Sequence, residues 1–369
     1  MTKNKMTKCT ILIPTYNRPN PLRRVLSYYN KYGRDFNIII ADASSNENKK
    51  LNKNIISKFS KLNIFYIDKY SPTVIVHQKL SDAINQVKTK YSVFCADDDF
   101  ITPNGINQSV TFLEKNPDFS CAHGHYISFY FKTNIIGGGK RYYQPIYPYK
   151  SISFVSVKKR LVFHFSSQYP TFYAVHRTDL LKIIFKDAVG FTDDVRFGEL
   201  LPTMLDLIYG KMKKLDVLYC AREKIYGFAR QTRKSYNDFI KNGTYDRKYN
   251  KFKNCLVEHL IKNSHTTSDE AKELIDKGMT EFLSKYYPKS FKHFIVGKMN
   301  KYFNPINLSE PVDRNIRMLY RKIFTSKDNF NKSKEMNNFK KKIENPNSKY
   351  FNDFEKISNH ISLYAKKEQ

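Results

Sequence analysis

Residues 91–99 of the chain read YSVFCADDD, an apolar run followed by three consecutive carboxylates, Asp97, Asp98 and Asp99. The apolar run shows no polar alternation, which is typical of a strand buried on both faces of a sheet. Neighbouring carboxylates raise one another's pKa values unless a cation lies between them. A divalent ion that prefers oxygen ligands, such as Mg²⁺ or Mn²⁺, is the simplest such cation. The alternative interpretation is that the three side chains only solvate a turn and cap the next helix.

Three similar apolar runs precede this one, at residues 9–14 (CTILIP), 36–41 (FNIIIA) and 62–67 (LNIFYI). Segments with helical spacing separate the four runs. Buried strands that alternate with helices predict a parallel sheet covered on both faces, and thus a nucleotide-binding α/β half. Ligands bind beyond the carboxyl ends of such strands. We therefore expect residues 15–18 (TYNR) and 42–45 (DASS), which follow the first two runs, to meet the carboxylates at one sheet edge.

The alternation of strands and helices continues to about the middle third of the chain and then stops. We expect an α/β domain at residues 1–234 and a helical basic region at residues 235–325, where no β-alternation occurs. In that second region Thr267 and Glu270 have the spacing of a capping box before a helix. Residues 326–369 are rich in Lys and Asn, and they predict a helical or flexible tail.

The composition limits the class of protein. The chain has 369 residues, 41% of them hydrophobic, which excludes disorder of the whole chain. No stretch reaches the ~18–20 apolar residues that cross a bilayer, and the basic start lacks the apolar segment of a signal peptide; we expect a cytoplasmic protein. Five cysteines without a CxxC pair fit neither a disulfide framework nor a zinc knuckle. The net charge of +30 implies attraction to nucleic acid, anionic lipid or phosphorylated small molecules.

Four motifs narrow these options. They lie at residues 11–19 (ILIPTYNRP), 41–45 (ADASS), 91–99 (YSVFCADDD) and 197–211 (FGELLPTMLDLIYGK). Together, over residues 8–233, they resemble the family 2-like glycosyltransferases of the GT-A fold. The resemblance implies a Rossmann-like mixed sheet with helices on both faces, to which this chain adds a mainly helical C-terminal region.

The resemblance also implies an activity. It implies transfer of a sugar from a nucleotide-diphospho-sugar, most commonly a UDP-sugar, to a hydroxyl group of a cell-surface glycan or a lipid-linked acceptor. By the same resemblance, the transfer inverts the configuration at the anomeric carbon and needs Mn²⁺ or Mg²⁺. By analogy, Thr15 and Tyr16 line the nucleotide pocket, Asp42 holds the base, Asp97 lies towards the ribose, and Asp98 or Asp99 holds the metal. The sequence departs from the family at Ala96, where many relatives have the first acidic residue, so both metal assignments stay open.

An inverting transfer needs a general base that takes the proton of the acceptor hydroxyl. In the family this base comes from an acidic pair at the start of the late helix. Glu199 matches it, although Leu200 replaces the second member, and Asp194 and then Asp193 are the alternatives. The same carboxylates could instead only stabilise a helix N-terminus.

Basic side chains are expected to stabilise the leaving diphosphate. Arg230 and Arg233 follow the last predicted strand, and Arg18 lies in the first loop. In a chain this basic, arginines in these loops could equally have no such role.

Other functions remain as alternatives. The same fold could serve a nucleotidyltransferase or a sugar-nucleotide or glycan-binding protein that does not catalyse transfer. We do not expect nucleic-acid binding, because the lysines are dispersed and no nucleic-acid-binding module is present. Residues 289–303 (KSFKHFIVGKMNKYF) mix Lys with apolar residues. They suit either peripheral binding to an anionic membrane or packing of a basic helix on the catalytic domain.

Overall fold

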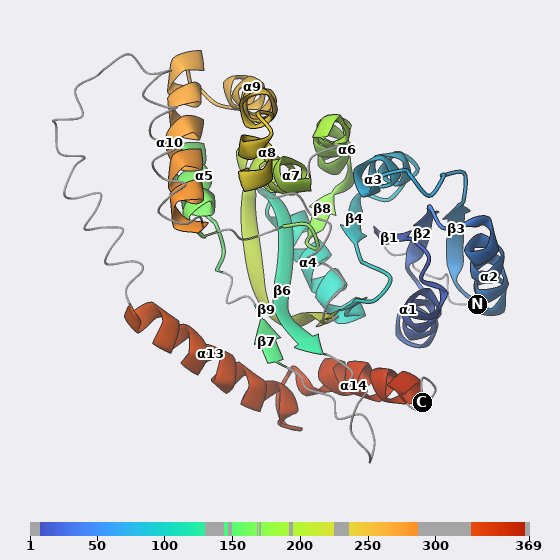
Figure 1. Ribbon diagram of the computed structural model, residues 1–369. Helices are drawn as coiled ribbons and strands as arrows, with labels where there is room; N and C mark the ends of the chain where they lie inside the picture. Colours follow the sequence, from blue (N-terminus) through green and yellow to red (C-terminus); the bar gives the residue numbers. More distant parts are fainter. Residues whose placement is uncertain are drawn as a thin grey trace.

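The computed structural model describes residues 8–129, 144–146, 150–167, 169, 171–191, 195–224, 236–286 and 326–365. Its centre is a nine-stranded mixed sheet with the strand order β3-β2-β1-β4-β8-β6-β9-β5, and β7 pairs with β6 (Figure 1). Residues 289–303, for which we considered membrane binding, lie outside the described residues.

The first half of the sheet is the predicted parallel unit. Its elements are β1 (Cys9–Thr15), α1 (Pro19–Tyr32), β2 (Asn37–Asp42), α2 (Asn46–Ile56), the short 3₁₀ helix η1 (Ser57–Phe59), β3 (Asn63–Ile67), α3 (Val76–Asn85) and β4 (Tyr91–Phe94). Strand β1 pairs in parallel with β2 and β4, and β2 pairs in parallel with β3. The register sets Thr15 opposite Asp42, so the loops after β1 and β2 start side by side.

The second half makes the sheet mixed. It contains β5 (Phe100–Ile101), α4 (Pro103–Lys115), β6 (Phe119–Phe129), β7 (Gln144–Ile146), α5 (Val157–Ser167), β8 (Val175–Arg177), α6 (Thr178–Ala188), the 3₁₀ helix η2 (Val189–Phe191), α7 (Val195–Tyr209) and β9 (Lys211–Glu223). Strand β8 pairs antiparallel with β4 and β6, whereas β6 and β9 are parallel. This architecture confirms the predicted GT-A-like class.

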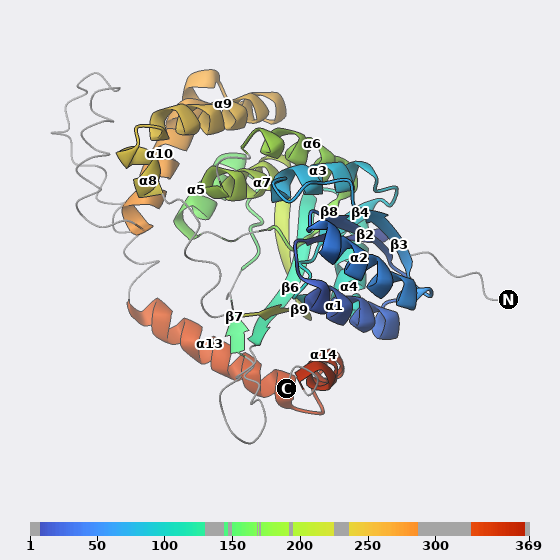
Figure 2. The same ribbon diagram turned by 45° about the vertical axis from the view of Figure 1, so that its right-hand side comes forward.

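Two hydrophobic cores cover the two faces of the sheet, because side chains alternate along each strand. Leu12 faces the core beneath α3, α6 and α7, whereas Ile11 and Ile13 face the core formed with α1 and α4. Figure 2 shows these two helical layers on opposite sides of the strands.

The C-terminal helices pack on both layers. Helices α8 (Tyr236–Lys241), α9 (Tyr245–Asn263) and α10 (Ser268–Tyr286) join the first core, with α9 against α7 and α10 against α5. The capping box is confirmed: the Thr267 amide donates to Glu270 Oε2 (3.1 Å) and the Glu270 amide to Thr267 Oγ1 (3.3 Å).

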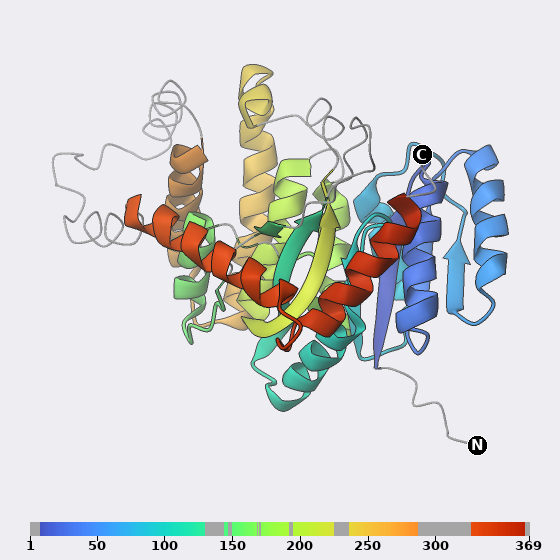
Figure 3. The ribbon, with the colours of Figure 1, turned by 90° about the horizontal axis from the view of Figure 1, so that it is seen from below.

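Helices α13 (Ser326–Glu344) and α14 (Phe351–Ala365) lie on the other side (Figure 3). Helix α13 contacts β7, and α14 contacts β9 and lies beside α1. Ile357 and Ile361 of α14 are fully buried in the core that also contains Leu22 and Val25 of α1. The predicted domain division stays a prediction, but α14 is packed on the α/β half. Among the described residues, no helix is both long and apolar enough to span a bilayer.

Candidate active site

The acidic triplet lies in the turn that follows β4. The Asp99 amide donates to the carbonyl of Ala96 (3.2 Å), which closes the turn. Asp97 and Asp99 are buried, with 3% and 2% of their surface exposed, whereas Asp98 is partly exposed. The three neighbouring carboxylates therefore have different environments.

Asp97 and Asp98 share one cation, the guanidinium of Arg18. Arg18 Nη1 lies 2.9 Å from Asp97 Oδ1, and Nη2 lies 2.8 Å from Asp98 Oδ2. Thr15 Oγ1 donates to the second oxygen of Asp97 (2.7 Å). Burial raises the pKa of Asp97 to about 7, and Arg18 opposes that shift. The expected meeting of the β1 loop with the triplet is confirmed, and two carboxylates already converge on one positive charge.

Asp99 has partners on the other side of the turn. Its Oδ2 accepts from Arg222 Nε (3.1 Å), and its Oδ1 accepts from the backbone amide of Glu223 (2.9 Å). Burial raises the pKa of Asp99, while the Arg222 guanidinium lowers it. Asp99 thus joins the triplet to the end of β9. Its assignment as a metal ligand stays a prediction, although both carboxylate oxygens have protein partners.

Asp42 is fully buried at the end of β2. Its Oδ1 accepts from the Ser44 amide (2.7 Å), and its Oδ2 accepts from Asn52 Nδ2 (2.7 Å) and Tyr66 Oη (2.6 Å). Burial and this carboxylate raise the pKa of the Tyr66 hydroxyl. Both oxygens of Asp42 therefore have protein partners, and direct contact with a nucleobase stays a prediction.

Asn17 joins the loops after β1 and β2. Its backbone has a φ of 53°, a left-handed conformation that Asn adopts more readily than most residues. Its amide donates to Ser44 Oγ (2.7 Å), and its side-chain oxygen accepts from the Ser45 amide (2.8 Å). The preceding residue, Tyr16, is 49% exposed, so its ring is accessible to a ligand.

Lys79 is a site residue that the sequence analysis missed. It is 4% exposed, and its Nζ donates to the backbone carbonyl of Thr15 (2.9 Å). Burial lowers its pKa to about 8, while Asp42 and Asp97 oppose the shift. The available signal was a lysine on the apolar face of α3, where a charged residue needs a specific reason.

Glu199 lies in the first turns of α7 and is exposed. The carbonyl of the preceding residue, Gly198, lies 3.0 Å from His77 Nε2 on α3. The start of α7 is therefore beside the helix that carries Lys79. The other predicted base candidates and leaving-group arginines, Asp193, Asp194, Arg230 and Arg233, lie outside the described residues.

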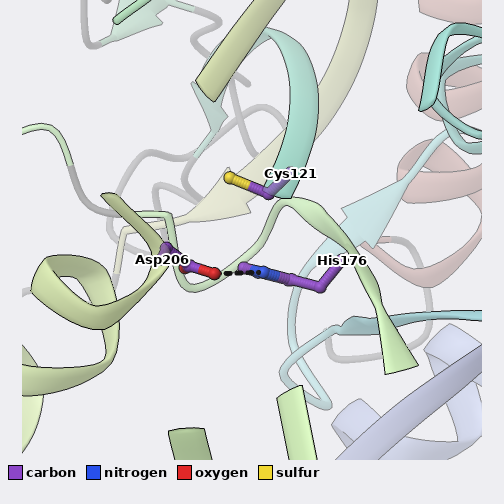
Figure 4. Close-up of side chains that lie close together, drawn as sticks. All are labelled: Cys121, His176 and Asp206. Carbon is purple, nitrogen blue, oxygen red and sulfur yellow. Dashed lines mark hydrogen bonds and ion pairs between the residues drawn. The ribbon is translucent and has the colours of Figure 1, made fainter. Parts of the chain in front are cut away.

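A second group of titratable residues lies within the core rather than at the strand ends. Cys121, His176 and Asp206 have potential ligand atoms within 4.8 Å of one another (Figure 4). His176 Nδ1 lies 3.0 Å from Asp206 Oδ1, and Nε2 lies 3.0 Å from the Thr171 carbonyl. All three side chains are almost fully buried, and the contact of His176 with Asp206 joins β8 to α7.

A third group contains Asp187, Cys255 and His259. Here too both ring nitrogens of the histidine have neighbours: Nε2 lies 2.8 Å from Asp187 Oδ2, and Nδ1 lies 2.8 Å from Tyr209 Oη. Hydrogen bonding between helices α6, α7 and α9 explains this arrangement.

Comparison with protein families identifies the class. Residues 10–169 match the model of Glycosyl transferase family 2, which covers β1 to α5 and includes the acidic triplet. This part of the chain is therefore similar to the family that the four sequence motifs indicate, and the resemblance is confirmed over these residues. A comparison with curated proteins found no match.

Several solved structures are similar to the chain. S. aureus TarS residues 1–349 in complex with UDP-GlcNAc is 16% identical, with a TM-score of 0.48, and the similarity covers 84% of this chain and 78% of that one. A longer S. aureus TarS chain is 15% identical (TM-score 0.47, 77% of this chain), and the match spans only 45% of its length. The mannosyltransferase PcManGT from Pyrobaculum calidifontis, in complex with GDP-Man and Mn²⁺, is 11% identical (TM-score 0.39, 81% of each chain). These similarities are too weak to assign a substrate.

Proposed function

We propose that the protein is an inverting, metal-dependent glycosyltransferase. It would move a sugar from a nucleotide-diphospho-sugar to a hydroxyl group of a cell-surface glycan or a lipid-linked acceptor. A UDP-sugar is the first candidate for the donor. The main support is the convergence of Thr15 and Arg18 with Asp97 and Asp98, within a domain that matches the glycosyltransferase family. The carboxyl ends of parallel strands are where such sheets bind nucleotides.

The residues at this point fit a divalent cation. Asp98 is the most accessible of the three carboxylates, and with Asp97 it already holds the positive charge of Arg18. We therefore assign Mn²⁺ or Mg²⁺ to Asp98 ahead of Asp99, because both carboxylate oxygens of Asp99 are held, by Arg222 and by the Glu223 amide. When bound, the ion would neutralise the diphosphate of the donor.

The donor pocket would use residues from both loops. Tyr16, exposed beside Thr15, would contact the nucleotide, and Asp97 would lie towards the ribose. Asp42 would hold the nucleobase of the donor, and its contacts with Asn52 and Tyr66 fix its orientation. Lys79 would hold the first loop in place through the Thr15 carbonyl.

Glu199 is the proposed general base. Its carboxylate would take the proton of the acceptor hydroxyl as that oxygen attacks the anomeric carbon from the side opposite the diphosphate, which inverts the configuration. Asp194 and Asp193, just before α7, are the alternatives. Arg230 and Arg233, with Arg18, would stabilise the charge on the leaving diphosphate.

The test uses the full-length protein with a panel of nucleotide sugars, Mn²⁺ or Mg²⁺ and candidate acceptors, and measures nucleoside-diphosphate release. We expect Asp98→Asn to lose both release and metal-dependent nucleotide binding. Glu199→Gln should lose transfer but retain nucleotide binding. Asp118→Asn, which removes a carboxylate paired with Lys211, is the matched control and should leave both unchanged.

Two outcomes would contradict the proposal. A product with retained anomeric configuration, seen by NMR, would exclude the inverting mechanism. Binding of a sugar nucleotide without turnover would favour the alternative of a non-catalytic binding protein.

A further inference from the structure

We propose that helix α14, near the C-terminal end of the chain, positions the acidic triplet through His360 and Arg24. The proposal rests on the proposed function for its effect on metal and donor binding. Residues 351–365 would then support the site of the α/β domain rather than form a separate tail.

Helix α14 is anchored on α1 and α4. Phe354, Ile357 and Ile361 belong to the core that contains Leu22 and Val25. At the start of α14, Asp353 Oδ2 accepts from Asn104 Nδ2 of α4 (2.8 Å). A helix held by buried apolar side chains and a hydrogen bond to a neighbouring helix has a defined position, as a positioning element must.

His360 is the contact from α14 to Arg24. It is 2% exposed, and its ring packs edge-on against Tyr28 and Phe100, with centroid distances of 5.5 and 5.7 Å. Its Nε2 lies 2.9 Å from the backbone carbonyl of Arg24. Because a carbonyl only accepts, Nε2 carries the proton and donates. Burial lowers the pKa of His360 to about 4, which keeps the ring neutral in this contact.

Arg24 extends from α1 to the backbone of the acidic triplet. It is 2% exposed, and its guanidinium lies 5.8 Å from the ring centroid of Phe100 and 5.9 Å from that of Phe129. Its Nη2 forms an ion pair with Glu223 and approaches the backbone carbonyl of Asp98 (3.5 Å). Arg24 therefore contacts both the triplet itself and the strand end that supports it.

Glu223 completes the connection. Its backbone amide holds Asp99 Oδ1, and the preceding residue, Arg222, holds Asp99 Oδ2. Burial raises the pKa of the Glu223 carboxyl, and the Arg24 charge opposes that shift. Without Arg24, this carboxylate would be buried beside Asp98 and Asp99 with less positive charge to balance it. The end of β9 and the triplet would then have to move together.

The test pairs two substitutions at one position in the full-length protein. His360→Phe keeps an aromatic ring but removes the donor, whereas His360→Gln keeps an N–H donor. Leu363→Ala changes an exposed residue of the same helix and is the control. Arg24→Lys tests the guanidinium directly. Thermal unfolding of each variant confirms that it is folded.

Two measurements are made on each variant. Amide hydrogen exchange of residues 95–101 reports the position of the triplet without any ligand. Electron paramagnetic resonance of Mn²⁺ reports metal affinity, and we expect it to fall about tenfold in His360→Phe and in Arg24→Lys, since residues that support metal ligands commonly have effects of this size. His360→Gln should restore most of the loss, and Leu363→Ala should match the wild type.

The outcomes separate the two proposals. Unchanged exchange of residues 95–101 in folded His360→Phe and Arg24→Lys would overturn the positioning role. Faster exchange in these variants, combined with a wild type that binds neither Mn²⁺ nor any sugar nucleotide, would overturn the proposed function and leave the positioning in place. Equal Mn²⁺ affinity in His360→Phe, His360→Gln and the wild type would overturn the link between α14 and the metal.

Discussion

Acidification from pH 7 to pH 5 should destabilise the protein through His164, a histidine buried in α5. The side chain is 2% exposed, and its Nδ1 has no hydrogen-bond partner among the described residues. Burial lowers its pKa from 6.5 to about 3. In the unfolded chain His164 therefore takes up a proton below pH 6.5, whereas in the folded chain the His164 ring stays neutral down to about pH 3. The contribution of His164 to stability is constant above pH 6.5 and decreases as the pH falls from there to about 3.

The size of this effect follows from the two pKa values. A pH of 5 is about 1.5 units below the pKa of His164 in the unfolded chain, whereas His164 in the folded chain is still neutral at that pH. Each pH unit corresponds to about 1.4 kcal/mol. The contribution of His164 to the free energy of unfolding should thus fall by about 2 kcal/mol, a sizeable part of the ~5–15 kcal/mol typical of a folded protein.

Urea unfolding of the wild type and His164→Leu at both pH values measures this contribution. Between pH 7 and pH 5 the variant should lose about 2 kcal/mol less than the wild type, since leucine does not titrate. Buried acids with raised pKa values, such as Asp97 and Glu223, have the opposite pH dependence, but they are common to both proteins and cancel in the difference. His265→Leu, at an exposed position, is the control. Equal pH dependence in wild type and His164→Leu would refute the reasoning.

Two further predictions concern close packing and capping. Gly124→Ala should lower the stability by about 1–3 kcal/mol, because the new Cβ would lie 2.4 Å from the Val217 carbonyl oxygen. Gly190→Ala, where the new Cβ would meet only the end of a lysine side chain at 3.3 Å, should change the melting temperature much less, and equal shifts would contradict this account. Thr102→Val should cost about 1–2 kcal/mol in chemical unfolding, since Thr102 Oγ1 accepts from the Gly105 amide and donates to the Leu218 carbonyl. An unchanged unfolding midpoint would show that this cap contributes nothing.

The α/β half could be predicted from the sequence because its strands are continuous apolar runs. The run at residues 36–41 can satisfy its backbone and bury both faces only inside a covered parallel sheet. Once the sheet was inferred, the carboxyl ends of its strands located the site, and the contacts of Thr15 and Arg18 with Asp97 follow from that geometry.

The contacts on which the choice between Asp98 and Asp99 as the metal ligand depends could not be predicted from the sequence. Asp99 is held by Arg222 and Glu223, more than a hundred residues away, and local spacing does not encode such pairings. Lys79 was missed because its partner is a backbone carbonyl rather than a side chain.

Helix α5 and the packing of α14 were missed for a different reason. Residues 157–167 lie in an aromatic-rich stretch without an obvious helix signal. The many Lys and Asn residues in residues 326–369 predict a helical or flexible tail rather than a helix packed on the α/β half. The apolar residues Phe354, Ile357 and Ile361 do recur at helical spacing. The sequence pattern does not show on which part of the protein these three apolar residues pack.

The packing of α14 on α1 also has a consequence for biosynthesis. Tyr32 ends α1 and Phe351 begins α14, so a ribosome that adds about 5–20 residues per second needs roughly 15 to 65 s to make the chain between them. For that time the face of α1 that includes Tyr28 and Tyr32 lacks its contact with His360 of α14. The nascent chain therefore exposes a surface that chaperones can bind until α14 has been synthesised.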